Sequence, residues 1–121
     1  MTHLLDAHTL IWSQDDPSRL GAAATALRDR SNVLVVSAET VWEIGIKVAI
    51  GKLKLANPFR DWIDTAVADF GLVLLPIQVD HIERHNALPF HHRDPFDRLL
   101  AAQSLASGMP LISARRSLMR T

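Results

Sequence analysis

The sequence contains no cysteine. This absence excludes disulfide bonds, thiolate metal ligands and cysteine nucleophiles together, as expected in a reducing cytoplasm. We also expect no secretion signal, because the first residues lack a basic region followed by an apolar stretch. No apolar run approaches the length that spans a membrane. The sequence therefore predicts a cytoplasmic protein without a membrane partner.

An excess of charge of either sign is absent as well, since 13 Lys and Arg balance 13 Asp and Glu. A strong overall field cannot hold a nucleic acid, so any basic patch must be local. The charge is polarised along the chain: residues 1–46 carry three Arg against six acids, whereas residues 91–121 carry five Arg against two Asp. The 121 residues, 48% of them hydrophobic, predict one compact domain over 1–121.

Short apolar runs alternate with helical patterns. Four of the runs are typical of parallel strands covered on both faces, namely residues 3–6, 33–37, 72–76 and 110–113. The helical stretches between them have recognisable ends, at Ser37 and Gly51, at Asn57 and Gly71, and at Asp94 and Gly108. This alternation predicts an open α/β fold with a mostly parallel, four-stranded sheet. Sites in such sheets lie beyond the carboxyl ends of strands, which draws attention to acids placed there.

Asp6 and Glu43 each have a purely structural interpretation. Asp6 ends the first apolar run, where an N-cap for the next helix is favoured. Glu43 lies four residues after Glu39 and four before Lys47, and a solvated ladder of salt bridges explains that spacing. The functional alternative places Glu43 at the rim of the core, because Trp42 and other apolar residues flank it.

Asp94 and Asp97 are three positions apart at the start of the last helix. Asp94 is the best cap in the chain, because Pro95 follows at the first helical position, where a missing N–H costs nothing. Asp97 is then the third helical residue, where a Glu or Gln would reach back to the cap better than an Asp. Asp97 is therefore the freer carboxylate of the two.

Asp6, Glu43 and Asp97 are acids at the ends of different elements, which suggests a cluster. Clustered carboxylates repel one another unless a cation joins them. Hard oxygen ligands without cysteine select Mg²⁺ or Mn²⁺ over zinc. Such ions favour phosphate chemistry, because they orient water, lower its pKa and neutralise charge on a scissile phosphate.

Nearly the whole chain resembles a known family, through "LLDAHTLIW", "VSAETVWEIGIKVAIGKLKL", "LPFHHRDPFDRLLAAQSL" and "PLISA". These segments resemble the PIN-domain ribonucleases, specifically the VapC-like toxins of type II toxin–antitoxin systems. The resemblance implies a three-layer α/β/α sandwich, Mg²⁺- or Mn²⁺-dependent hydrolysis of RNA phosphodiesters, a VapB-like antitoxin and a homodimer. It also assigns the catalytic and metal-binding roles to Asp6, Glu43 and Asp97. Asp94 then caps its helix or supports the site from behind.

The sequence departs from this family after its last apolar run. The family carries Thr or Ser, any residue, then Asp, whereas this chain reads Ser113-Ala114-Arg115. The fourth carboxylate is missing, and the guanidinium of Arg115 could occupy the position of a second cation. The alternative function is therefore a degenerate PIN domain with weak or no nuclease activity that binds an antitoxin or RNA. Ser113 remains a candidate metal ligand or phosphate contact.

Several other residues have competing interpretations. His81 and His85 are spaced as metal ligands can be, but an exposed helix face is favoured. The loop residues His91, His92 and Arg93 could contact RNA phosphates or solvent equally well. Core or dimer packing is favoured over base stacking for the three tryptophans, Trp12, Trp42 and Trp62. Surface charge is favoured over a phosphate contact for the two lysines that follow Gly51, Lys52 and Lys54.

Overall fold

A sheet of four parallel strands forms the centre of the computed structural model, which describes residues 1–89 and 94–114. The strands lie in the order β3-β2-β1-β4, and they are β1 (Thr2–Leu5), β2 (Val33–Ser37), β3 (Val73–Leu75) and β4 (Leu111–Ile112). Each of the four predicted apolar runs overlaps a strand. Leu5 pairs with Val36 on one side and Ile112 on the other, so β1, β2 and β4 reach the same edge of the sheet.

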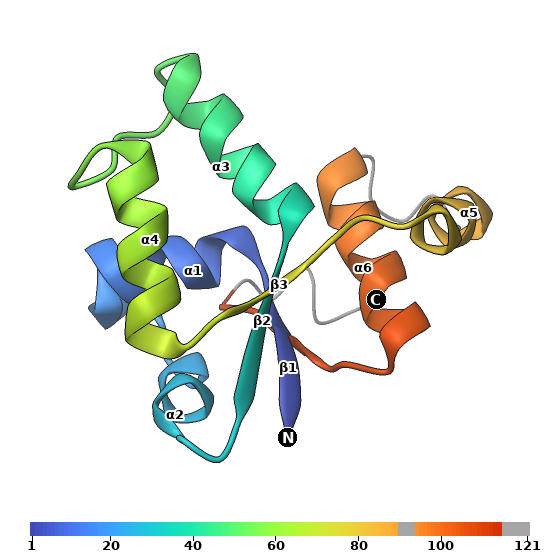
Figure 1. The fold of residues 1–121 in the computed structure, drawn as a ribbon, viewed down its shortest axis with the longest axis horizontal. Helices are drawn as coiled ribbons and strands as arrows, with labels where there is room; N and C mark the ends of the chain where they lie inside the picture. The colour runs from blue at the N-terminus through green and yellow to red at the C-terminus, as the bar shows by residue number, and fades with distance from the viewer. Residues whose placement is uncertain (90–93, 115–121) are drawn as a thin grey trace.

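Helices connect these strands and cover both faces of the sheet. In chain order they are α1 (Ala7–Asp15), the short 3-10 helix η1 (Pro17–Arg19), α2 (Ala23–Arg28), α3 (Ala38–Ala49), α4 (Phe59–Phe70), α5 (Val79–Ala87) and α6 (Pro95–Ser107). Figure 1 shows α1, α2 and α4 on one side of the sheet and α5 and α6 on the other. The predicted three-layer α/β/α sandwich with a parallel four-stranded sheet is confirmed.

The helix ends are where the sequence predicts them. Ser37 caps α3 by accepting a hydrogen bond from the backbone N–H of Glu39, and Asp94 caps α6. Gly71 ends α4 and Gly108 ends α6, with φ angles of 60° and 66°. Such left-handed backbone at a helix end favours glycine because a side chain would be strained there.

Two apolar clusters hold the three layers together. Leu5 and Val36 point into the larger cluster, which Trp62 of α4 fills from one side of the sheet. Leu4 and Val35 point the other way, into a smaller cluster closed by Leu100 of α6. Neighbouring residues of one strand therefore face opposite layers, as a sheet buried on both faces requires. The prediction that Trp62 packs in the core is confirmed.

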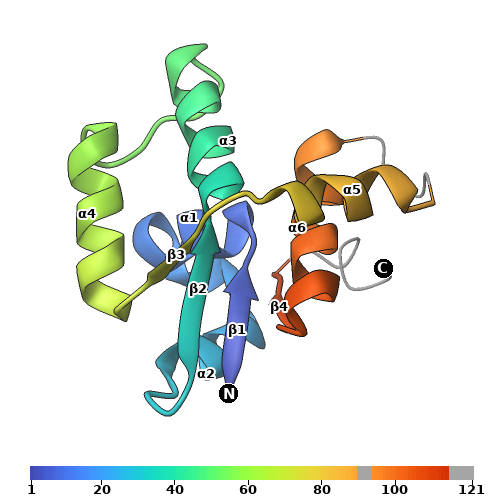
Figure 2. The same cartoon turned by 45° about the vertical axis from the view of Figure 1, so that its right-hand side comes forward.

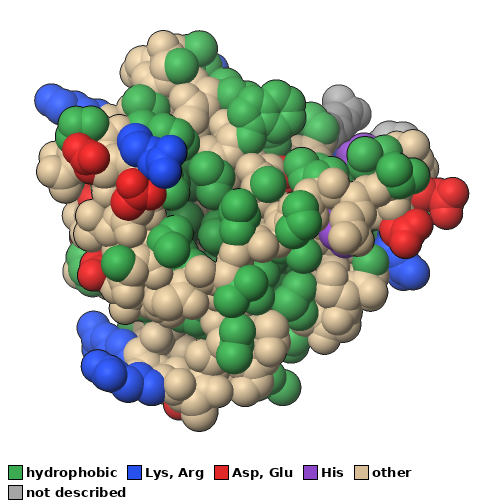
Figure 3. All heavy atoms as spheres, viewed as in Figure 1, with side chains coloured by type: hydrophobic (Ala, Val, Ile, Leu, Met, Phe, Trp, Pro, Cys, Tyr) green, Lys and Arg blue, Asp and Glu red, His purple; other side chains and the backbone are tan. Residues whose placement is uncertain are grey.

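Apolar side chains also gather on the surface. Figure 3 shows them across the middle of the face seen in Figure 1, over β3 and the neighbouring helices. Val73 and Leu74 lie on the edge strand β3 and are 51% and 59% exposed. Trp42 is 61% exposed and meets Phe96 edge-on at 5.4 Å, so it does not pack in the core of this chain, and its predicted alternative of dimer packing stays a prediction. None of the helices described in residues 1–89 and 94–114 has the length and apolar character needed to cross a membrane.

Candidate active site

Acidic and hydroxyl side chains from four segments gather at the carboxyl edge of the sheet. Asp6 directly follows β1, Ser113 follows β4, and α3 begins where β2 ends. Helix α6 packs against α3, and Figure 2 shows its first turns beside the start of α3. The parallel pairing of β1 with β4 therefore brings Asp6 and Ser113 to one edge, as their positions after strands suggest.

Asp6 has both carboxylate oxygens engaged by its own chain, and its side chain is only 2% exposed. Oδ1 accepts a 2.8 Å hydrogen bond from the backbone N–H of Thr9, so the predicted N-cap is confirmed. Oδ2 accepts a 2.6 Å hydrogen bond from the hydroxyl of Ser113. The two hydrogen bonds use different oxygens, so Asp6 caps α1 and at the same time binds the residue that follows β4.

Thr9 is a site residue that the sequence interpretation missed. Its hydroxyl donates to the carbonyl of Ile112 at 3.3 Å and accepts from the backbone N–H of Ala114 at 3.0 Å. These bonds tie the end of β4 to the first turn of α1. The available signal was its spacing, since Thr9 lies three residues after Asp6 and its backbone is the one that Asp6 caps.

Glu39 and Glu43 are buried on α3, with exposures of 1% and 5%. The interpretation of their spacing as a solvated ladder is therefore wrong, and the alternative at the rim of the core holds. Lys47 donates a 2.9 Å hydrogen bond to Oε2 of Glu43. Thr40 donates to Oε1 of Glu39 at 2.9 Å, while Oε2 of Glu39 has no hydrogen-bond partner within the described part of the chain.

The burial of these glutamates changes their protonation. Burial raises the pKa of Glu39 to about 8, against its hydrogen bond from Thr40, and the negative charges of Glu43, Asp97 and Asp94 raise it further. Burial also raises the pKa of Glu43; Lys47 opposes that shift, whereas Asp94 and Asp97 add to it. Carboxylates of α3 and α6 therefore repel one another across the contact between these helices.

The first turn of α6 supplies the other two acids. Asp94 accepts a 2.9 Å hydrogen bond at Oδ1 from the backbone N–H of Phe96, which confirms it as the cap. Asp97 lies in the same turn and is 8% exposed. The neighbouring side chain of Arg98 donates to the carbonyls of His85, at 2.8 Å, and of Pro89, at 2.9 Å. Arg98 thereby anchors this turn to the end of α5.

The donor set at this edge matches a hard divalent cation in its chemistry. The side chains offer carboxylate and hydroxyl oxygens only, and the buried Oε2 of Glu39 lacks a partner among the residues described. A cation would also relieve the repulsion that raises the pKa of Glu43. Within residues 1–89 and 94–114, however, no group of three His, Cys, Asp or Glu side chains is close enough to hold a metal ion together. The metal-binding roles of Asp6, Glu43 and Asp97 stay a prediction.

The remaining predictions concern His81 and four other candidate residues. His81 is 4% exposed, so its predicted place on an exposed helix face is wrong. Its Nδ1 accepts from the backbone N–H of Gln78 and lies 3.3 Å from Nε2 of Gln103, which joins α5 to α6. The remaining candidates, His91, His92, Arg93 and Arg115, lie outside the described residues.

Three comparisons place this chain among known proteins. The family model of the PIN domain matches residues 3–118. Ribonuclease VapC22 of Mycobacterium tuberculosis (strain ATCC 25618 / H37Rv) is 29% identical over 118 residues, which are 97% of this chain and 89% of that protein. The crystal structure of VapBC2 from Rickettsia felis, bound to a DNA fragment from their promoter, aligns with a TM-score of 0.72 over 99% of this chain and 92% of that chain. Its 13% sequence identity makes this a likeness of fold.

Proposed function

The chain belongs to the PIN-domain family, and we propose that it is a Mg²⁺- or Mn²⁺-dependent endoribonuclease, the VapC-like toxin of a toxin–antitoxin pair. The observation that carries this proposal is the pair of buried acidic helix faces, Glu39 and Glu43 on α3 opposite Asp97 on α6. Burying carboxylates together is costly unless a cation joins them. The similarity to a protein named a ribonuclease supports RNA as the substrate.

Asp6, Glu43 and Asp97 are the proposed metal ligands. The bound ion would lower the pKa of a water molecule and neutralise charge on the scissile phosphate. Two neighbouring side chains contact these ligands. Ser113 orients Asp6 through Oδ2, and Lys47 offsets the charge of Glu43.

Two residues of α6 hold its acidic turn in place. Asp94 caps the helix, and Arg98 binds the carbonyls at the end of α5. Both contacts fix the backbone around Asp97, so we propose that Asp94 supports the site from behind rather than holding the ion.

Cleavage of a single-stranded RNA by the purified chain, with Mn²⁺ and with EDTA, tests this proposal. We expect cleavage in Mn²⁺ alone, and its loss in Asp97→Asn and Glu43→Gln. The matched control is Asp64→Asn, an exposed acid of α4 that pairs with Arg60 at 3.1 Å. Equal activity of all three variants, each folded by circular dichroism, would contradict the assignment.

The second candidate function is the degenerate PIN domain, the alternative that the sequence raises because Arg115 stands where the family carries an acid. A guanidinium near Asp6 or Asp97 would compete with a divalent ion for the same negative charge. The variant Arg115→Asp should then bind Mn²⁺ more tightly and gain RNA cleavage, and Asp97→Asn should remove that gain. A wild-type chain that cleaves RNA well, with no gain from Arg115→Asp, would favour the active toxin.

We further propose that the protein acts in the cytoplasm with a VapB-like antitoxin, whose basic side chain enters the acidic site. The solved fold relative is a VapBC complex, which supports such a partner. A small reading frame beside this gene should encode the antitoxin, and co-purification with inhibition of cleavage tests it.

The proposed homodimer would use the exposed apolar side chains of β3. Val73 and Leu74 lie on an edge strand, and Val79 at the start of α5 is 78% exposed. Exposed apolar patches mark association surfaces. Light scattering should therefore show a dimer that Leu74→Lys converts to a monomer, whereas Arg28→Gln, at an exposed position of α2, should leave the dimer intact.

A further inference from the structure

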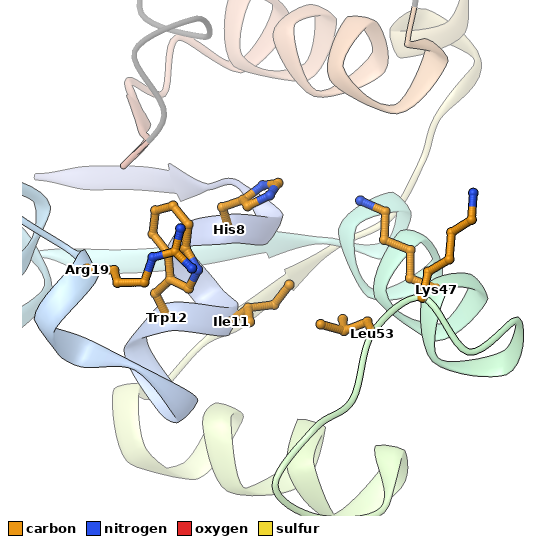
Figure 4. A pocket seen from close by; sticks show the side chains of 7 residues that line it. His8, Ile11, Trp12, Arg19, Lys47 and Leu53 are labelled. Atoms are coloured by element: carbon orange, nitrogen blue, oxygen red, sulfur yellow. The ribbon is translucent and has the colours of Figure 1, made fainter.

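A pocket of about 530 Å³ lies beside the proposed active site, between α1 with η1 and the end of α3. Its lining includes three cationic side chains, Arg19, Lys47 and Lys52, together with Trp12 and His8, and none of the lining residues that the structure describes is an Asp or Glu. Figure 4 shows His8, Trp12 and Arg19 on one wall, and Lys47 and Leu53 on the other. The walls thus combine positive charge with aromatic surface.

Trp12 and Arg19 form a preassembled contact in this pocket. The guanidinium carbon of Arg19 lies 4.3 Å from the centroid of the Trp12 ring. The ring of His8 meets the same tryptophan edge-on, with the centroids 5.3 Å apart. Flat aromatic and guanidinium groups of this kind are the surfaces on which proteins stack unpaired bases.

Lys47 connects the pocket to the carboxylates. Its side chain lines the pocket, and its ammonium group lies 2.9 Å from Oε2 of Glu43. A strand with one phosphate beside Glu43 would therefore have its neighbouring nucleotide at the pocket. Because the chain has a net charge of +0, this local concentration of cations is where a polyanion would be held.

We propose that this pocket binds one unpaired nucleotide of a single-stranded RNA substrate, adjacent to the phosphate that is cleaved. The base stacks on the guanidinium of Arg19, which the Trp12 ring supports from the other side, and Lys52 contacts the backbone phosphate. The inference rests on the proposed function, because it extends the RNA from the carboxylate site. It adds a role to Trp12, which also packs against the larger apolar cluster as predicted, and it replaces the interpretation of Lys52 as surface charge alone.

The pocket favours a nucleotide over an acidic peptide. Its volume is in the range of sites for small ligands, which runs from roughly 300 to 1,000 Å³. An acidic peptide could satisfy the cations, but it would leave the stacked Arg19 and Trp12 without a flat partner. A base-paired strand is disfavoured as well, because its bases have no free face for stacking.

Binding of a fluorescein-labelled single-stranded oligoribonucleotide to the full chain in EDTA, measured by anisotropy, tests this proposal without cleavage. The double variant Arg19→Gln/Lys52→Gln should bind about tenfold more weakly than wild type and with a weaker salt dependence. The control is Lys54→Gln/Arg60→Gln, which removes the same charge outside the pocket and should bind nearly as wild type does. Equal losses in the two double variants would overturn the pocket assignment.

A second comparison separates base stacking from phosphate contact. Wild type should prefer the RNA over an abasic strand of the same length and charge, and Trp12→Leu should lose this preference. Trp42→Leu, at the 61% exposed tryptophan outside the pocket, should keep it. An absent preference in wild type, or equal competition by an oligoglutamate of matched charge, would overturn the proposal.

Cleavage assays with Mn²⁺ on the same preparations separate the two hypotheses. RNA cleavage by wild type, together with RNA binding that Arg19→Gln/Lys52→Gln does not weaken, would refute the pocket assignment but not the proposed nuclease activity. RNA binding that the pocket variant weakens, without any RNA cleavage, would refute the proposed nuclease activity but would support the pocket as an RNA-binding site.

Discussion

The hydroxyl of Ser113 donates a 2.6 Å hydrogen bond to Oδ2 of Asp6, across 107 positions of the chain. The bond joins the residue after β4 to the residue after β1, because these strands are neighbours in the sheet. It also holds a carboxylate that is 2% exposed, so the oxygen has little access to water as a replacement partner.

We predict that Ser113→Ala destabilises the fold. A buried carboxylate oxygen that loses its donor retains its desolvation cost, so the free energy of unfolding should fall by about 1–3 kcal/mol. Urea denaturation measures this change. Ser18→Ala is the control, because it removes an exposed hydroxyl that donates to Asp16 and should cost less than about 0.5 kcal/mol. Equal effects of the two changes would mean that the bond to Asp6 contributes nothing specific.

Asp94→Ala should lower the free energy of unfolding by about 1 kcal/mol, because it removes the cap of α6. Chemical denaturation gives this value, and calorimetry with Mn²⁺ tests whether the metal site survives. We expect metal binding to persist, since Asp94 is proposed to support the site rather than to hold the ion. Intact stability with abolished metal binding would reverse the roles assigned to Asp94 and Asp97.

Glu39 should make stability fall as the pH rises. Its pKa is about 8 in the folded protein and 4.5 as an ordinary glutamate, so the folded state keeps a proton that the unfolded chain releases. The contribution is fully present below about pH 4.5 and is lost as the pH rises through the folded pKa, with a slope of about 1.4 kcal/mol per pH unit between the two values.

Glu39→Gln tests this slope, because glutamine resembles the protonated acid and can still accept from Thr40. The variant should become more stable than wild type as the pH approaches 8, as measured by denaturation across that range. Glu83→Gln, at an exposed position of α5, should instead follow the wild-type curve. A constant difference between Glu39→Gln and wild type at every pH would show that folding does not raise the pKa of Glu39.

Mn²⁺ affinity should increase with pH if Glu43 is a ligand. The raised pKa of Glu43 means that protons compete with the metal for its carboxylate above the ordinary glutamate range. Calorimetry at a series of pH values from acidic to neutral should show binding that tightens as the pH rises, with proton release. Glu43→Gln should weaken binding and reduce this dependence, whereas Asp64→Asn should do neither. A pH-independent affinity would remove Glu43 from the metal site.

Local sequence patterns predicted the elements of this fold well. Asp94 followed by Pro95 marks the start of α6, and Gly108 marks its end, because caps act on their own helix. The run at residues 33–37 coincides with β2 for the same reason, since a continuous apolar stretch needs no distant partner to favour a strand.

Burial of individual side chains was predicted less well. His81 and Glu39 are buried, against the interpretations that their types and spacings favoured, and Trp42 does not pack in the core of this chain. Helical periodicity says which residues share a face, but it does not say which face meets another element. Glu39 is buried along with Glu43 because their shared face of α3 faces inward, close enough to α6 for its acids to affect both glutamates.

The sequence by itself determined that Asp6 ends a strand and caps the following helix, since both properties depend on neighbouring residues. It also determined the separate roles of Asp94 as a cap and Asp97 as a later residue of the same turn. Only the tertiary structure decided that Ser113 meets Asp6, and that the hydroxyl of Thr9 meets the end of β4, at one edge of the sheet. That meeting depends on the pairing of β1 with β4, which no local pattern encodes because the two strands come from opposite ends of the chain.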